Sequence, residues 1–109
     1  MEKNSIPLSV TELSKSGDDY TIENHIVTLK KSGYIDIIGI CSVNESTQRA
    51  SVVVSLNNIA INTCYFNNVL TNDMGLKHIA APKNSALEIS RTGDRGYVAI
   101  NAICVFTPD

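Results

Sequence analysis

Alternation of apolar and polar residues with a period of two is the feature that most constrains this chain. Between Ala50 and Leu56, one face carries Val52 and Val54 while the other carries mostly serine. Successive side chains of a β-strand point to opposite faces, so this pattern predicts a strand with one buried face. Ile and Val together number 22 against 7 Leu, and β-branched residues favour pleated surfaces. The sequence therefore predicts an all-β protein.

Similar segments recur along the chain, with turn residues between them. The expected strands are residues 6–13, 20–22, 25–29, 34–43, 50–56, 59–61 (continued by 65–66 and 69–70), 76–81, 86–90 and 97–106. The expected loops or turns are residues 14–19, 44–48, 82–84 and 91–96.

Asn57 and Asn58 tolerate positive φ, which predicts a type I′ hairpin turn, and Pro7 is expected at a sheet edge. Residues 68–77 are the one weak candidate for a helix, which Gly75 disfavours. Strands at this spacing predict a two-sheet antiparallel sandwich, folded as a single domain over residues 1–109.

Two segments are apolar on both faces, which a two-layer sandwich does not explain by itself. Isoleucines occupy both faces of residues 34–43, and Asn101 is the only interior polar residue of residues 97–106. A strand that is apolar on both sides needs cover on both sides, since burying one Ile or Val contributes roughly 1.5–3 kcal/mol. We therefore expect a copy of the chain to cover the second face, unless sheet curvature, loops or the first strand cover it. The expected interface residues are Tyr34, Ile38, Ile40, Tyr97 and Ala99.

Charge and hydropathy bear on the possible partners. The net charge is −2, and Lys30 and Lys31 form the densest basic spot. Binding to nucleic acid needs a basic face, and a polybasic membrane anchor needs a cluster of the same kind. We therefore expect neither nucleic acid nor membrane as a partner. The first residues lack the apolar stretch of a secretory signal, so we expect either cytoplasmic synthesis without Sec export or a trimmed piece of a longer chain.

Residues that could perform chemistry are few, and we expect no enzyme. The only histidines are His25 and His78, and no Gly-x-Ser-x-Gly motif is present, so no nucleophile–base–orienter set can be recognised. His and Cys spacings suited to a metal are absent as well. Two pairs, Asp18-Asp19 and Asn72-Asp73, could bind Ca²⁺ through oxygen but are more typical of solvated turns. The sequence predicts no cofactor and no metal.

Three cysteines, Cys41, Cys64 and Cys104, each lie inside an apolar segment and none belongs to a CxxC pair. An odd number in this setting predicts buried, reduced thiols. The alternative is a disulfide between Cys41 and Cys104, which would require their strands to be neighbours.

The order of the segments is similar to that of the tumour-necrosis-factor (TNF) and complement-type globular head superfamily. Residues 29–37 (LKKSGYIDI) resemble that family's x-x-x-G-x-Y-x-Ψ-x strand, and residues 51–61 (SVVVSLNNIAI) resemble its V-x-L-x-x-N-G hairpin. Residues 84–89 resemble its late strand and residues 97–106 its closing strand. The likeness is greatest to bacterial and phage versions, such as heads that cap spore-surface fibres or form the tips of phage fibres. The chain departs from them in its short length and in having no collagen-like stalk or coiled coil before the head.

This resemblance implies a TNF-like jelly roll that assembles as a trimer. The predicted function is a non-catalytic structural module, the homotrimeric head of a virion, a phage fibre or a bacterial surface particle that serves adhesion. The alternative is a carbohydrate-binding or receptor-binding domain that contacts a glycan or a host surface receptor. Its candidate ligand residues are Tyr65, Phe66, Asn67, Asn68 and Asn72. A small cupin-like enzyme is a third possibility, disfavoured because cupins need a His-rich metal set.

Overall fold

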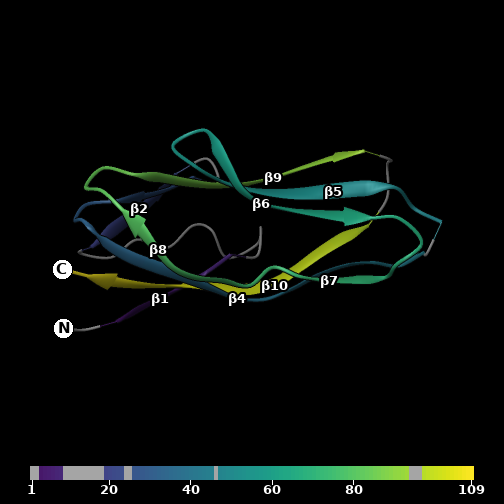
Figure 1. The fold of residues 1–109 in the computed structure, drawn as a ribbon, viewed down its shortest axis with the longest axis horizontal. Helices are drawn as coiled ribbons and strands as arrows, with labels where there is room; N and C mark the ends of the chain where they lie inside the picture. The colour runs from purple at the N-terminus through teal and green to yellow at the C-terminus, as the bar shows by residue number, and fades with distance from the viewer. Residues whose placement is uncertain (1–2, 9–18, 24–25, 46, 94–96) are drawn as a thin grey trace.

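A computed structural model describes residues 3–8, 19–23, 26–45, 47–93 and 97–109. The described residues form strands in two sheets, without a helix (Figure 1). In chain order the strands are β1 (Asn4–Pro7), β2 (Tyr20–Glu23), β3 (Ile26–Leu29), β4 (Gly33–Val43), β5 (Ala50–Leu56), β6 (Ile59–Phe66), β7 (Thr71–Asp73), β8 (Leu76–Ala81), β9 (Ala86–Gly93) and β10 (Val98–Pro108). No helix in this part of the chain has the length and hydropathy that a membrane span needs.

The strands pair antiparallel throughout and form two five-stranded layers. Sheet A has the order β1-β10-β4-β7, with β8 also paired to β4, and sheet B has the order β2-β3-β9-β5-β6. Figure 1 shows the two sheets as separate layers with the chain crossing between them. The predicted two-sheet antiparallel jelly roll is confirmed. Since β1 is at the end of sheet A, the expected edge position of Pro7 is confirmed too.

The core lies between the sheets and follows from the period-two pattern. In β5 the alternate residues Val52, Val54 and Leu56 are buried, as the sequence predicts. Phe66 of sheet B and Phe106 of sheet A are the largest fully buried side chains. Each sheet therefore turns one apolar face inward, and the sandwich closes over that shared layer.

The hairpin between β5 and β6 has the predicted turn. Asn57 and Asn58 adopt φ of 55° and 66°, which is the left-handed pair that a type I′ turn requires. The Asn57 side chain also joins the turn to β9, because its Oδ1 accepts a hydrogen bond of 2.9 Å from the Ala86 backbone N–H. The turn prediction is confirmed, and asparagine serves here both as turn residue and as a link between strands.

Several predicted strand limits were wrong, and strand pairing explains the differences in β6 and β9. β6 continues to Phe66 because β5 pairs with it over its whole length, as far as Ala50 opposite Phe66. The predicted turn at residues 91–96 is strand as far as Gly93, since β5 also pairs with β9 to that point, and residues 94–96 lie outside the described part. The short strand β7 was not predicted, residues 69–70 are not strand, and residues 68–77 form no helix. The first strand was predicted over residues 6–13, of which residues 9–13 lie outside the described part.

All three cysteines are buried and free, as predicted. The strands of Cys41 and Cys104 are neighbours, as a disulfide would require, but the register places Ile100 opposite Cys41 and Ile37 opposite Cys104. The two thiols therefore lie too far apart along the strands to bond. Burial raises the pKa of Cys104 to about 12, with the Asp36 carboxylate adding to the effect. Burial likewise raises the pKa of Cys41 to about 12, with the Cys64 thiol as a second cause.

Candidate functional site

The outward face of sheet A carries large apolar side chains in the open. On β4, Ile38 is 60% exposed and Ile40 is 43% exposed. The register places Ile103 of β10 directly opposite Ile38. We call this surface the apolar patch, and it consists of Tyr34, Ile38, Ile40, Ala99 and Ile103.

Of the predicted interface residues, four lie on the outward face of two adjacent strands: Tyr34, Ile38, Ile40 and Ala99. Tyr97 comes just before β10 and is 59% exposed, with its carbonyl accepting a hydrogen bond of 3.1 Å from Gln48 Nε2. The sequence prediction omitted Ile103, although it has the same parity as Ala99. Its parity places it on the same face as Ala99, and the cross-strand register adds that it lies directly opposite Ile38.

The described part of the chain does not cover this patch. The alternative considered from sequence was cover by loops or by the first strand. β1 instead pairs with the edge of β10, with Ser5 opposite Val105, so it extends the sheet sideways. Within the described residues, the patch therefore remains open to solvent.

A bulge in β8 lies at one edge of the apolar patch, beside Tyr34. The register between β4 and β8 shifts between Ile35 and Ile37. His78 of β8 has a φ of 56°, and its backbone N–H donates a 2.8 Å hydrogen bond to Asp36 Oδ1. The His78 ring stacks on the Tyr34 ring with centroids 3.9 Å apart and an interplanar angle of 5°. His78 thus has a structural role at the surface, whereas His25 lies outside the described residues.

A groove of about 860 Å³ adjoins the patch on sheet A. Its apolar lining includes Ile38, Leu76 and Val105. Its charged lining is balanced in sign, with two lysines and two aspartates: Lys3, Lys77, Asp36 and Asp73.

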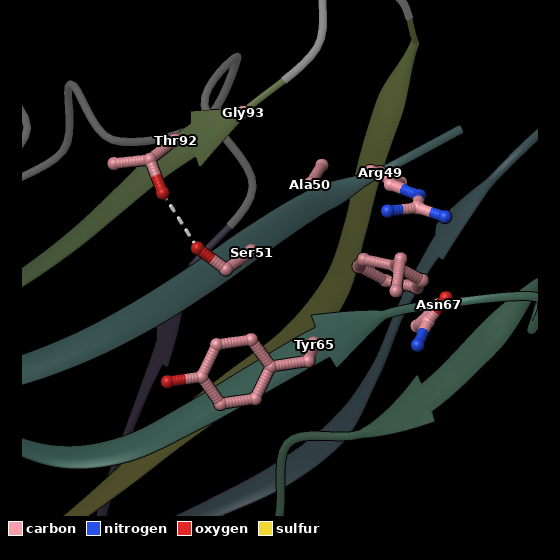
Figure 2. A pocket seen from close by; sticks show the side chains of 8 residues that line it. Arg49, Ala50, Ser51, Tyr65, Asn67, Thr92 and Gly93 are labelled. Carbon is pink, nitrogen blue, oxygen red and sulfur yellow. Dashed lines mark hydrogen bonds between the residues drawn. The ribbon is translucent and has the colours of Figure 1, made fainter.

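The outward face of sheet B carries a second hollow, of about 410 Å³ (Figure 2). Ser51 of β5 stands between Tyr65 of β6 and Thr92 of β9 in the strand register, so the three side chains lie abreast. Ser51 Oγ and Thr92 Oγ1 share a hydrogen bond of 2.6 Å. Figure 2 shows the Tyr65 ring near Ser51, and Arg49 and Asn67 also line the hollow.

The candidate ligand residues predicted from sequence separate into distinct positions. Tyr65 and Asn67 line the hollow, and Asn72 supports it by donating a 2.7 Å hydrogen bond from Nδ2 to the Tyr65 carbonyl. Phe66 also lines the hollow, but it is 2% exposed and belongs to the core, so its expected place as an exposed contact residue is corrected. Asn68 has a φ of 62° and is not part of the lining.

Three polar residues of the hollow were missed by the sequence prediction. Arg49, Ser51 and Thr92 come from segments that are distant in sequence from Tyr65. Arg49 immediately precedes β5, Ser51 is the second residue of β5, and Thr92 lies in a stretch predicted as a turn. Because pairing of β5 with both β6 and β9 brings them together, no local sequence signal could have found them.

The acidic pairs considered for Ca²⁺ have other partners. Asp73 Oδ1 accepts a 2.7 Å hydrogen bond from the Gly75 N–H, which forms a local turn. Asp19 forms an ion pair of 2.7 Å with Lys31, while Asp18 lies outside the described residues. Where the structure describes the chain, no three His, Cys, Asp or Glu side chains cluster in a way that could hold a metal ion.

The similar solved structures include a TNF-family protein and a domain of a xylanase. GITRL from bushbaby, a TNF-family protein, matches with a TM-score of 0.69 and 13% identity over 98% of this chain and 94% of that one. GITRL from pika matches with a TM-score of 0.67 and 13% identity over 95% and 92%. The CBM36-1 domain of a multidomain xylanase from the hindgut metagenome of Trinervitermes trinervoides matches with a TM-score of 0.58 and 14% identity over 99% of both chains. No protein-family model and no curated protein sequence matches the chain.

At 13–14% identity these matches show the fold alone. They confirm the predicted TNF-like jelly roll. The fold is shared by a TNF-family protein and a carbohydrate-binding module, so function has to be argued from the surfaces of this chain.

Proposed function

We propose that this chain is a non-catalytic assembly module, a homotrimeric TNF-like head whose subunits pack through the apolar patch. The observation that carries the proposal is the exposure of Ile38 directly opposite Ile103 at the centre of sheet A, next to Ile40. Single apolar residues on a surface are ordinary, but a contiguous group in the middle of a sheet is typical of an interaction site. Covering each isoleucine contributes roughly 1.5–3 kcal/mol, which favours association.

A second copy of the chain is the occupant that the surface favours. The adjoining groove pairs two lysines with two aspartates, so it can complement an identical surface rotated about a symmetry axis. An apolar centre with a charged rim is also the usual anatomy of a protein interface. Resemblance to TNF-type heads favours three copies around one axis.

The setting that we propose is a virion, a phage fibre or a bacterial surface particle. Its support is the order of the sequence segments, which resembles the bacterial and phage heads of that superfamily. In such a setting the module acts by geometry: a shared apolar seam forms a rigid knob, and the outward face of sheet B remains available for contacts. No covalent step is part of this role.

The mass in solution tests the proposal. Light scattering at micromolar concentration should give three times the chain mass of 11.8 kDa. Ile38→Asp should convert the trimer to a monomer, with a dissociation constant raised at least about 100-fold, because it would bury an unpaired carboxylate. Ser90→Asp adds the same charge to an exposed position of sheet B and should leave the trimer intact. A native chain that is monomeric at this concentration would refute the proposal.

A further inference from the structure

We infer that Cys41 and Cys64 form a redox-sensitive link between the two sheets, in which oxidation joins their thiols as a disulfide. Cys41 belongs to β4 of sheet A and Cys64 belongs to β6 of sheet B. Within the described residues the strands of one sheet do not pair with those of the other, and a shared apolar core holds the two layers together. A bond between these two cysteines would therefore add a covalent connection to that packing.

Both cysteine side chains point into the core between the sheets. Cys41 is fully buried, and Cys64 is only 5% exposed. In β6, Cys64 stands opposite the fully buried Val52 of β5, so its side chain projects from the inner face of sheet B. In β4, Cys41 follows the exposed Ile40, and side chains alternate along a strand, so it projects from the inner face of sheet A. The two thiols thus enter the same interior from opposite layers.

The short strand β7 shows that the two thiols come to the same part of this interior. After β6 the chain crosses to sheet A and forms β7 beside β4 (Figure 1). The register places Asn72 of β7 opposite Cys41, and Asp73 is the next residue of β7. The Cys64 thiol donates a hydrogen bond of 3.4 Å to the Asp73 carbonyl. The Cys64 side chain therefore spans the space between the layers and reaches the strand that lies beside Cys41.

The two thiols also interact with each other. Burial, followed by the electrostatic effect and the hydrogen bond of the Cys64 thiol, raises the pKa of Cys41 to about 12. Thiols that share a hydrogen bond are already neighbours, and a small side-chain movement brings them to the S–S separation of about 2.05 Å. Cys104 differs from this pair, because its raised pKa results from burial and the Asp36 carboxylate rather than from a second thiol.

A small disulfide such as oxidised glutathione supplies a balanced route to the link. The thiolate of one cysteine attacks the S–S bond of the oxidant, forms a mixed disulfide and releases one glutathione thiolate. The second protein thiolate then attacks the protein sulfur of the mixed disulfide and releases the other glutathione. The protein pair loses two electrons and two protons, which reduce the oxidant to two thiols. Because burial keeps Cys41 protonated and hidden in the folded chain, this exchange requires local opening of the strands and is slow.

The link makes the stability of the sandwich depend on its redox state. A disulfide stabilises a fold mainly by restricting the unfolded chain, and the gain increases with the length of the closed loop. The loop from Cys41 to Cys64 contains the whole of β5 and the hairpin turn that follows it. We therefore expect the oxidised chain to melt at least about 10 °C above the reduced chain.

Refolding in a glutathione redox buffer tests this inference with the full chain. The reduced chain is refolded from urea in that buffer, so that burial does not limit access to the thiols, and free thiols are then blocked in urea. Trypsin cleavage after Lys31, Arg49, Lys77 and Arg95 separates the three cysteines into residues 32–49, 50–77 and 96–109. We expect residues 32–49 joined to 50–77 at least about tenfold more often than either alternative pair, because only these two thiols are neighbours. Residues 96–109 should be recovered with a blocked thiol.

Cys104→Ala is the matched control, since it also removes a buried thiol. It should keep both the joined peptides and the rise in melting temperature on oxidation, whereas Cys64→Ala should lose both. The inference would be overturned by the absence of joined peptides, by a bond that includes Cys104 or connects two chains, or by an oxidised chain that melts no higher than the reduced one. Ile38→Asp separates this test from that of the assembly proposal, because the link lies within one subunit and should form whether or not the subunits associate.

Discussion

The inward faces of the two sheets are alike in their side chains, whereas the outward faces differ. Inward, each contributes a buried phenylalanine, Phe106 from sheet A and Phe66 from sheet B. Outward, the central strands of sheet A expose isoleucines such as Ile38. The outward side chains of sheet B include instead Ser90 and Thr92, with Tyr65 as an aromatic exception at one end.

This difference teaches that the inward and outward patterns carry separate information. The inward alternation specifies the sandwich, because any sequence with that period buries one face of each sheet. The outward residues have no such constraint, so their chemistry reports what the surface contacts. Under the assembly proposal, the outward face of sheet A meets another apolar surface, whereas the outward face of sheet B remains in water.

The largest expected loss of stability comes from a substitution at the centre of sheet A. Gly39 has a φ of 145°, and a β-carbon there would lie 2.3 Å from the Asn101 carbonyl oxygen and 2.4 Å from Ala102 Cα. Gly39→Ala should therefore lower the free energy of unfolding by about 3 kcal/mol or more, since neither backbone can move without parting β4 from β10. Urea denaturation measures this loss.

The corresponding change in sheet B serves as its comparison. Gly93→Ala also meets backbone atoms, but Gly93 is the last residue of β9 and the strand end can yield. We expect a loss of about 1 kcal/mol. Equal losses at both sites would contradict the view that β4 and β10 form the less tolerant pair.

An intermediate effect concerns the thiols of sheet A. The raised pKa of Cys104 means that the folded chain keeps its proton while the unfolded chain, at an ordinary pKa near 9.0, releases it as pH rises. The contribution of the protonated Cys104 thiol to the free energy of unfolding is therefore complete below pH 9 and is lost progressively from about pH 9 to 12. Between pH 8 and 10, the free energy of unfolding of the native protein should fall by about 1 kcal/mol more than that of Cys104→Ala. The native protein should also resist iodoacetamide at pH 9 and react in urea, and rapid native labelling would contradict the prediction.

The smallest expected effect tests whether the apolar patch is open within one subunit. In an Ile38→Asp background, which should be monomeric, Ile40→Thr should change the free energy of unfolding by less than about 0.5 kcal/mol, as exposed substitutions do. Denaturation of the two monomeric variants measures the difference. A loss near 2 kcal/mol would mean that the chain itself covers Ile40, and the distinction between the two outward faces would fail.

Local sequence patterns predicted most strands, the type I′ turn and the buried thiols. Each depends on neighbouring residues: period-two burial, tolerance of positive φ at Asn57, or an apolar context around Cys104. Strand ends were predicted less well, because they depend on the partner. Residues 91–93 have the composition of a turn and become strand only because β5 continues beside them. The same reason explains why Tyr65 was predicted as a ligand residue while Arg49 and Thr92 were not.

The sequence by itself determined that this protein is an antiparallel sandwich with two strands that are apolar on both sides, because alternation and β-branching are local properties of the chain. The tertiary structure decided that those two strands are adjacent, which joins Ile38 and Ile103 into one surface. It also gathered Ser51, Tyr65 and Thr92 from three strands, with Arg49 just before β5, into one hollow. Strand order and register arise from long-range pairing, and a pattern of period two is compatible with many pairings, so only the folded chain selects among them.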